Sequence, residues 1–455
     1  MRKFVLGLFI LVMSFGAFCL PAQGQLWPGS ASKVLTRPTL PANCEPRNGQ
    51  IIYLQTGNRG IYSCTETNIW TRLDTSGTFN VKAFGALGNG AADDSAAIVL
   101  ALAAMNAPAA PADRVGTLFF PRGSYRYNTV GGIVLGSGQS LKGEGPLASR
   151  LNYFNAAGLG VSIQGTATVL GKVTVEGISL TNIAGGLNGI VIGSMDGIVI
   201  QNCVIQDWLT NGINATLAGG GRLRGLDVLS TSILGGNNFG VTLDDTAAAG
   251  ALTHVAFKSV HIASPRACIT VTNGIHNLTV DNCRMSVPLG AGVYIIGAGG
   301  TMNNSSIVGS HLDTASDVAA ILIPAGSGIF IGGNHILNSV GAGAQFPVNI
   351  GVVAGITVTG NEIVANGGGV TGTPTFALMA GNLITTAGLQ YAATIPPYLV
   401  TLTGQPLFTT SIQANLGAPP NGTLIYCTDC TIANPCAGAG PGALAKRVGG
   451  AWVCN

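Results

Sequence analysis

Leu278–Met285 has the sequence LTVDNCRM, and Ile356–Ile363 has the similar sequence ITVTGNEI. Both octets follow one pattern: apolar, any, apolar, any, small polar, any, any, apolar. Copies of this pattern begin at Val173, Ile198, Leu226, Val255, Leu278, Ser305, Ile329 and Ile356. Successive copies start 23 to 29 residues apart. Repeats of this length that hold short strands predict a solenoid, whereas the blades of a propeller need about 40 residues.

Each octet predicts two short strands separated by a bend. Strand alternation places positions one and three inside, and the apolar position eight also points inward. Position five is mostly Asn, Ser or Gly, as a bend requires. A further strand follows in most repeats, as in Ala267–Thr272 and Gly292–Ile296. Cys203 and Cys283 share position six, but they are about 14 Å apart along the stack, so we expect buried free thiols.

The region before the repeats carries a family resemblance. Phe79–Ala86 (FNVKAFGA) leads into Gly88–Ser95 (GNGAADDS), and Gly116–Tyr125 (GTLFFPRGSY) follows after a short apolar segment. This opening resembles that of the pectate-lyase-like superfamily, which includes polygalacturonases, rhamnogalacturonases, some β-glucanases and phage tailspikes. The resemblance implies an all-β chain whose residues 76–410 form a right-handed parallel β-helix.

Little α-helix is expected beyond residues 94–105. Ile98, Leu102 and Met105 share one face of this segment, which predicts a lid on the first coil. The preceding aspartates, Asp93 and Asp94, are expected to cap the exposed helix amides rather than to act in catalysis.

The catalytic motifs of the polygalacturonases are missing. No His is followed by Gly, no Arg-Ile-Lys occurs, and Asp244-Asp245 is the one Asp-Asp pair after Asp93-Asp94. The dense aspartate cluster of calcium-dependent pectate lyases is also missing. No catalytic residue is therefore carried over from the family, because a shared fold does not grant an activity.

The repeat phase offers an independent candidate site. Outward positions four and seven collect many of the few ionisable residues, and they predict a polar strip on one sheet with about 4.8 Å between neighbours. In this interpretation the catalytic residues are His311, His335 and Arg284, and the substrate-binding residues are His261, Lys258, Asp281 and Glu362. Histidine can transfer protons, and Arg or Lys can hold a uronate carboxylate.

The alternative is a solvated ladder, in which His335 pairs with Glu362 and Lys258 pairs with Asp281. Such pairs contribute at most about 1 kcal/mol. Asp313 and Asp317, expected in a loop beside the strip, are too few for more than a weak calcium site, since Ca²⁺ takes six to eight oxygen ligands. No other metal or cofactor is expected. Asn334 and Asn361 share position six and predict a hydrogen-bonded asparagine ladder.

The N-terminus predicts export. Arg2 and Lys3 precede the apolar run Phe4–Leu20, and Ala22–Gly24 supplies small residues for cleavage. Residues 1–24 therefore read as a secretory signal peptide. A membrane anchor is the alternative, but the run is short beside the roughly 20 residues that span a bilayer, and no basic cluster follows it. We expect a secreted or cell-surface protein with no membrane span after removal of the signal.

Cysteines gather near both ends of the mature chain. They are Cys44 and Cys64 at one end, and Cys427, Cys430, Cys436 and Cys454 at the other. Export favours disulfides, namely Cys44–Cys64 and two bridges among the last four, for which three pairings exist. A four-cysteine zinc site is the alternative, because Cys427 and Cys430 have ligand spacing.

The two ends also resemble each other. Asn48–Tyr53 (NGQIIY) matches Asn421–Tyr426 (NGTLIY), and each copy is followed by a tryptophan. We expect small disulfide-stapled β modules at residues 25–75 and 411–455 that cover the exposed edges of the solenoid. A carbohydrate-binding or trimerising role for these modules is the alternative.

The low charge of the chain limits the kinds of partner that we expect. Only 9% of residues are charged, and the net charge of +3 is too small to indicate nucleic acid. The expected partner is a polysaccharide. Two classes stay open: a lyase or glycoside hydrolase of a pectin-like or other acidic glycan, and a non-catalytic adhesin or glycan-binding surface protein. The family's usual activities favour the first, and the missing motifs favour the second.

Overall fold

The computed structural model describes residues 35–44, 51–54, 60–72, 77–106, 115–164, 172–217, 221–235, 238–245, 252–287, 291–314, 319–338, 346–366, 368–374, 376–386, 410–411, 424–433 and 435–455. The chain divides into two compact units, Met1–Asp74 and Thr75–Asn455. The predicted signal peptide lies outside the described residues, as do residues 387–409, which lead to the predicted end of the β-helix. No helix in the described part is long and apolar enough to cross a membrane.

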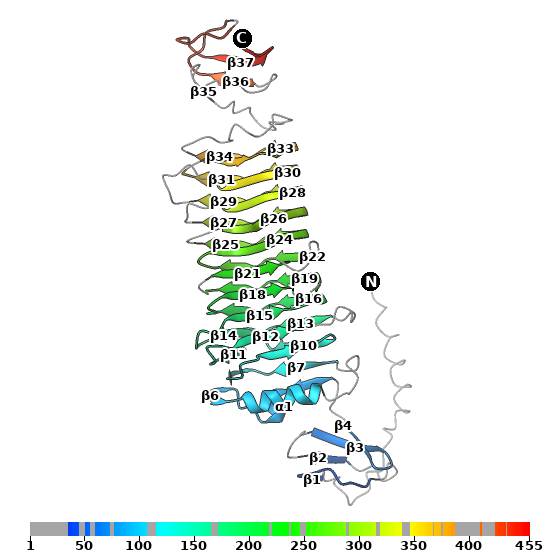
Figure 1. Ribbon diagram of the computed structural model, residues 1–455. Helices are drawn as coiled ribbons and strands as arrows, with labels where there is room; N and C mark the ends of the chain where they lie inside the picture. The colour runs from blue at the N-terminus through cyan, green and yellow to red at the C-terminus, as the bar shows by residue number, and fades with distance from the viewer. Residues whose placement is uncertain are drawn as a thin grey trace, which may run out of the picture. The chain divides into compact units, whose positions relative to one another are not determined.

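Parallel strands stack into a β-helix with three faces (Figure 1). Face A consists of β5 (Thr78–Asn80), β7 (Gly116–Phe120), β10 (Gln139–Gly143), β13 (Val173–Glu176), β16 (Met195–Gln201), β19 (Leu223–Leu229), β22 (Leu252–Lys258), the C-terminal parts of β24 (Ala267–Asp281), β26 (Ala291–Val308), β28 (Ile321–Gly332) and β30 (Val348–Thr359), and β33 (Phe376–Ala380).

Face B precedes face A in each turn and joins it in an 18-stranded sheet. It consists of β9 (Ile133–Leu135), β12 (Leu159–Ile163), β15 (Asn188–Ile192), β18 (Asn211–Thr216), β21 (Phe239–Asp244), the N-terminal parts of the four long strands, and β32 (Val370–Gly372). The long strands β24, β26, β28 and β30 each continue from face B into face A, and the pairings of β24 with β26 and of β26 with β28 shift register between the two faces.

Face C is a separate 12-stranded sheet. It consists of β6 (Asn89–Asp93), β8 (Gly123–Tyr127), β11 (Ser149–Tyr153), β14 (Ser179–Asn182), β17 (Val204–Gln206), β20 (Ser232–Leu234), β23 (His261–Ala263), β25 (Arg284–Val287), β27 (His311–Thr314), β29 (His335–Asn338), β31 (Glu362–Ala365) and β34 (Leu383–Thr386). All described pairings within these two sheets are parallel, so the predicted parallel β-helix is confirmed.

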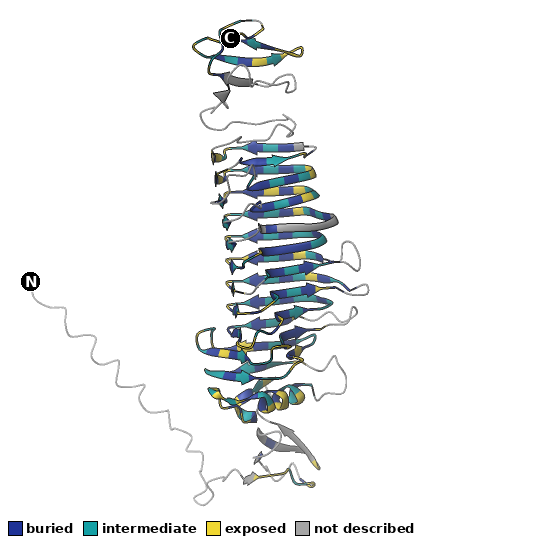
Figure 2. Cartoon of the chain, turned by 60° about the vertical axis from the view of Figure 1, so that its left-hand side comes forward, coloured by how far each residue is buried: buried dark blue, intermediate teal, exposed yellow. Residues whose placement is uncertain are grey.

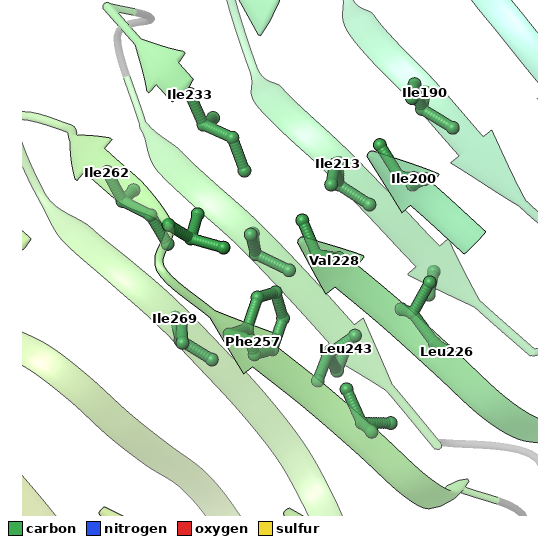
Figure 3. Packing of buried hydrophobic residues seen from close by; sticks show 14 of the residues in the cluster. Ile190, Ile200, Ile213, Leu226, Val228, Ile233, Leu243, Phe257, Ile262 and Ile269 are labelled. Carbon is green, nitrogen blue, oxygen red and sulfur yellow. The ribbon is translucent and has the colours of Figure 1, made fainter. Parts of the chain in front are cut away.

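The core fills the interior between the faces, and burial alternates along the strands (Figure 2). Inward positions align in register, so that Ile233 lies beside Ile262 and Val228 beside Phe257. These four side chains point into the same interior, and each is fully buried (Figure 3). Because the same register repeats from turn to turn, the inward residues of every turn meet in one core. This is why the period-two pattern of the sequence identified the core.

The bend at position five requires a left-handed backbone. Its residues are Gly177, Asn202, Ser230, Ser259, Asn282, Gly309, Gly333 and Gly360, and their φ angles lie between 46° and 64°. This conformation costs most L-residues about 1–2 kcal/mol, and Gly and Asn adopt it most readily. The bend turns the chain from face A to face C, which explains why position five tolerates so few residue types.

Free thiols lie inside this corner. Cys203 and Cys283 are buried and unbridged, as predicted, and so is Cys268 on β24. Burial raises the pKa of Cys203 to about 12 and that of Cys283 to about 11, so both stay protonated and inert at neutral pH.

An asparagine ladder runs along the same corner. Nδ2 of Asn334 donates to Oδ1 of Asn361 at 2.9 Å, and Asn361 donates likewise to Asn382 at 2.9 Å. Nδ2 of Asn334 also reaches the carbonyl of Ile307 at 2.8 Å, and Nδ2 of Asn361 reaches that of Ile331 at 3.0 Å. The predicted ladder is confirmed and extends to the next turn of the β-helix, at Asn382.

Replacing Asn361 by alanine is expected to lower the free energy of unfolding by about 2 kcal/mol, because it leaves buried partners unsatisfied. Urea denaturation measures the change. Thr359→Ala, two residues earlier on the outward side of β30, is the matched control and should change stability by less than about 0.5 kcal/mol. Equal effects of the two changes would show that the ladder contributes nothing.

The predicted helix is present as α1 (Ser95–Met105), preceded by the 3-10 helix η2 (Val81–Phe84). Its buried face packs against β5, β7 and η2 at the first turn of the β-helix, as the lid interpretation requires.

The prediction that Asp94 caps α1 is wrong. Its carboxylate accepts from the main-chain nitrogens of Leu87 at 2.6 Å and of Arg126 at 3.3 Å, and it makes no bond to the helix. The backbone of Asp94 is not in the extended conformation that aims a cap side chain along the helix. Oδ1 of Asp93 instead accepts from the first helix amide, that of Ser95, at 3.0 Å.

The two terminal segments share one topology, which accounts for their sequence match. One four-stranded sheet comprises β1 (Leu35–Arg37), β2 (Ile51–Leu54), β3 (Gly60–Glu66) and β4 (Ile69–Arg72), and the other comprises β35 (Thr410–Ser411), β36 (Leu424–Cys427), β37 (Ala443–Val448) and β38 (Ala451–Cys454). In each sheet the first pair is parallel and the next two pairs are antiparallel.

Disulfides staple the C-terminal sheet. Cys427 pairs with Cys430, and Cys436 pairs with Cys454, which settles the choice among three connectivities. Cys44 is also disulfide-bonded, but the side chain of Cys64 lies outside the described residues. The Cys44–Cys64 bridge therefore stays a prediction.

The protein should carry no zinc on its C-terminal cysteines. Because these four thiols are consumed in disulfides, an alkylating reagent should label them only after reduction. Mass spectrometry with and without reductant tests this. Labelling without reductant, together with stoichiometric zinc, would contradict it.

Candidate functional site

The five residues predicted at position seven lie in register on neighbouring strands of face C. They are His261 on β23, Arg284 on β25, His311 on β27, His335 on β29 and Glu362 on β31. We call this line the face C column. Its strands lie one above another (Figure 1), with about 4.8 Å between neighbours. The predicted outward alignment is therefore confirmed, whereas the roles of its members stay predictions.

Each member of the column is held by a buried neighbour. The residues that directly follow the five column members are all fully buried: Ile262, Met285, Leu312, Ile336 and Ile363. Because adjacent side chains of a strand point to opposite faces, anchoring these residues in the core aims the column at solvent. Arg284 and Glu362 are exposed, and the three histidines are half-buried.

The prediction of one strip on one sheet is wrong for Lys258 and Asp281. The two residues are backbone register partners on β22 and β24, and these strands belong to face A. The left-handed bend at Ser259 and Asn282 separates them from the column. No ion pair joins the two side chains within the described part of the chain, so the predicted Lys258–Asp281 pair is not formed.

Two histidines and a carboxylate make the closest contacts of the column. Nδ1 of His311 lies 2.8 Å from Nδ1 of His335, and the ring centroids are 4.7 Å apart at an interplanar angle of 41°. The opposite nitrogen of His335, Nε2, lies 3.4 Å from Oε2 of Glu362. The predicted His335–Glu362 pair is thus confirmed, and it extends into a chain of three groups.

Burial and nearby positive charge keep two histidines neutral. Partial burial lowers the pKa of His311, and the neighbouring His335 and Arg284 lower it further, against an opposing effect of Asp313. The pKa of His261 is also lowered, first by burial and then by Arg284. Both imidazoles are therefore free bases at neutral pH, which is the state that a proton acceptor needs.

Asp313 belongs to the same surface as the column. The expectation of a loop position is wrong, because Asp313 lies on β27 two residues after His311 and pairs with Ser286 and Leu337. The two-residue spacing from His311 was the signal that could have placed it on the outward side. Asp317 lies outside the described residues, so the weak calcium site stays a prediction.

Comparison with known proteins finds similarity in structure alone. No family model matches the sequence, and no curated protein matches it. Among solved structures, the gp42 tailspike of Acinetobacter phage vb_AbaP_AS12 is 10% identical with a TM-score of 0.53, over 92% of this chain and 87% of that chain.

Two further similar structures have lower scores. PfbA, a surface adhesin of Streptococcus pneumoniae, is 14% identical with a TM-score of 0.43, over 83% of this chain and 99% of that chain. The A-module of the mannuronan C-5 epimerase AlgE4 of Azotobacter vinelandii is 15% identical with a TM-score of 0.38, over 71% and 99%. Together with the three stacked faces, the tailspike match shows the fold: the chain is a right-handed parallel β-helix.

Proposed function

We propose that this chain is an exported β-helix protein that binds a linear anionic polysaccharide along the face C column. The observation that carries the proposal is the in-register line of five ionisable side chains, in a protein of which only 9% of residues are charged. Export rests on the signal sequence of residues 1–24, and N-terminal sequencing of protein from the culture medium tests it.

The column suits a carboxylate-bearing chain in its chemistry. The guanidinium of Arg284 is exposed and can hold a carboxylate through two parallel hydrogen bonds. His261 and His311 lie on either side of it, in register. Because the strands repeat at about 4.8 Å, a polysaccharide that runs along the β-helix axis meets these groups one after another.

A lyase is the second candidate, and the lowered pKa of His311 favours it. In β-elimination, His311 would remove the proton α to the uronate carboxylate, and Arg284 would neutralise that carboxylate. The electron pair of the broken C–H bond would form the new carbon–carbon double bond, and the glycosidic oxygen would leave and take up a proton from water. His335 would orient His311 through its Nδ1 contact. The same surface without turnover would serve a glycan-binding adhesin.

A hydrolase fits less well. Its two carboxyl groups must be about 5–5.5 Å or 6.5–9.5 Å apart. Asp313 and the column member Glu362 lie two strands apart and on different outward lines of the sheet. Strand spacing therefore places their Cα atoms about 10 Å apart or more.

A panel of acidic and neutral polysaccharides tests the proposal. Binding is measured by calorimetry, elimination by the absorbance of new unsaturated ends, and hydrolysis by new reducing ends. We expect binding to uronate polymers that weakens as salt is raised. Binding restricted to neutral glycans would overturn the proposal, and new reducing ends without unsaturated ends would exclude the lyase candidate.

A further inference from the structure

The contact between His311 and His335 points to a ligand smaller than a polysaccharide. We propose that Nδ1 of His311 and Nδ1 of His335 together bind a divalent transition-metal ion, with Cu²⁺ bound more tightly than Ni²⁺ or Zn²⁺. This site does not rest on the proposed glycan function, since its ligands need no carbohydrate.

The spacing of the two nitrogens matches such an ion. Metal–imidazole bonds are about 2.0–2.1 Å long, so two nitrogens at a bond angle near 90° are about 2.9 Å apart. The two Nδ1 atoms already lie 2.8 Å apart. Tetrahedral coordination needs about 3.3 Å, which requires the rings to separate. The shorter spacing suits the square arrangement typical of Cu²⁺ and Ni²⁺, and Cu²⁺ has the highest affinity of the series for nitrogen ligands.

Glu362 gives His335 a carboxylate partner of the kind that metal-binding histidines commonly have. Such a histidine usually presents its second ring nitrogen to a carboxylate, which fixes the tautomer and strengthens the ligand. Oε2 of Glu362 lies 3.4 Å from Nε2 of His335. A proton held on Nε2 leaves the lone pair on Nδ1, which faces His311.

The charges around the pair are mixed. Glu362 on β31 and Asp313 on β27 favour a cation, and the guanidinium of Arg284 on β25 opposes it. Asp313 lies on the same side of β27 as His311, two residues away, and water molecules would supply the remaining ligands. With two protein ligands, we expect affinity in the micromolar range, which corresponds to about 8 kcal/mol.

Calorimetry on the untagged mature chain tests the site. After dialysis against a chelator, CuCl₂, NiCl₂ and ZnCl₂ are titrated at neutral pH without glycan. We expect one Cu²⁺ per chain, at least about 10-fold weaker binding in His311→Ala and in His335→Ala, and about 10-fold or greater weakening in Glu362→Gln. Affinity should fall as the solution is acidified, because protonated imidazole cannot bind a metal.

Two controls separate this site from adventitious binding. His261→Ala removes a column histidine that is separated from His311 by Arg284, and it should bind Cu²⁺ like the parent. The nitrogen hyperfine pattern of bound Cu²⁺ should indicate two imidazoles in the parent and one in His335→Ala. No saturable binding, or an equal loss in His261→Ala, would overturn the proposal, and glycan binding measured in chelator would be unaffected by that outcome.

Discussion

Replacing His311 by alanine is expected to lower any elimination rate by about 100-fold or more, because general-base catalysis contributes about 10²–10⁴ to a rate. His311 and His261 both have a lowered pKa and an adjacent guanidinium in register, that of Arg284, and His311 is the one of the two that contacts a second histidine, His335. The substitution removes the proton acceptor and leaves the β-helix intact, since Leu312 beside it supplies the buried contact. Initial rates on a uronate polymer, followed by absorbance, measure the change.

The pH profile gives a second measurement of the same residue. Because burial and positive neighbours lower the pKa of His311 below the ordinary value of about 6.5, the free base persists into mildly acidic solution. The rate should therefore hold constant on lowering the pH past 6.5 and fall only when the pH passes through the lowered pKa. If the rate instead fell at or above the ordinary histidine pKa of about 6.5, the proton acceptor would be another group.

The control for this prediction is His276→Ala. His276 is half-buried like His311 but lies on the part of β24 that pairs with Thr253 of face A, away from the column. Its replacement should leave the rate unchanged. If His311→Ala also turned over like the parent, the column would be a solvated surface and a base would have to be sought elsewhere.

Arg284→Ala should weaken binding of an anionic glycan by about 1.5–3 kcal/mol, the contribution of a hydrogen bond to a charged group. This corresponds to a dissociation constant about 12- to 160-fold higher. The expected loss is large because Arg284 is the one cation of the column that is charged at every working pH. Stability should change by less than about 0.5 kcal/mol, since the side chain is exposed.

Arg150→Ala is the matched control for this second prediction. Arg150 is also exposed on face C, on β11, and its line of partners runs through Ser179, Val204 and Ser232 to His261. It therefore lies on the same outward line, far from the histidines. Equal weakening by the two substitutions would indicate a diffuse attraction to positive charge rather than a site at Arg284.

Burial and bending were predictable from the octets because the β-helix repeats one local rule. An apolar residue at position one or three must point inward in every turn, as Leu278 and Val280 do, both fully buried. Position five must adopt a left-handed backbone, as Asn282 does with φ of 51°. Neither requirement depends on distant parts of the chain, so a single sequence reveals both.

Other features depend on where the bends and loops lie in space. Lys258 and Asp281 follow the outward alternation, yet the corner assigns them to face A while the histidines lie on face C. Asp94 occupies a capping position in the sequence, yet its carboxylate binds the amide of Arg126, 32 residues away. A local sequence pattern cannot predict either result. The alternation of a strand does not say on which side of a bend a neighbouring residue lies, and so it does not say which face or partner its side chain meets.

The sequence alone therefore identified the parallel β-helix and the members of the face C column, since both follow from periodicity. The sequence also predicted the pair of His335 with Glu362, whereas the contact between His311 and His335 came from the folded structure. His311 and His335 are 24 residues apart, and register brings their strands together, but the contact between the two Nδ1 atoms depends on the orientation of each ring above the sheet. That orientation is set by packing against neighbouring groups such as Glu362, which no repeat pattern encodes.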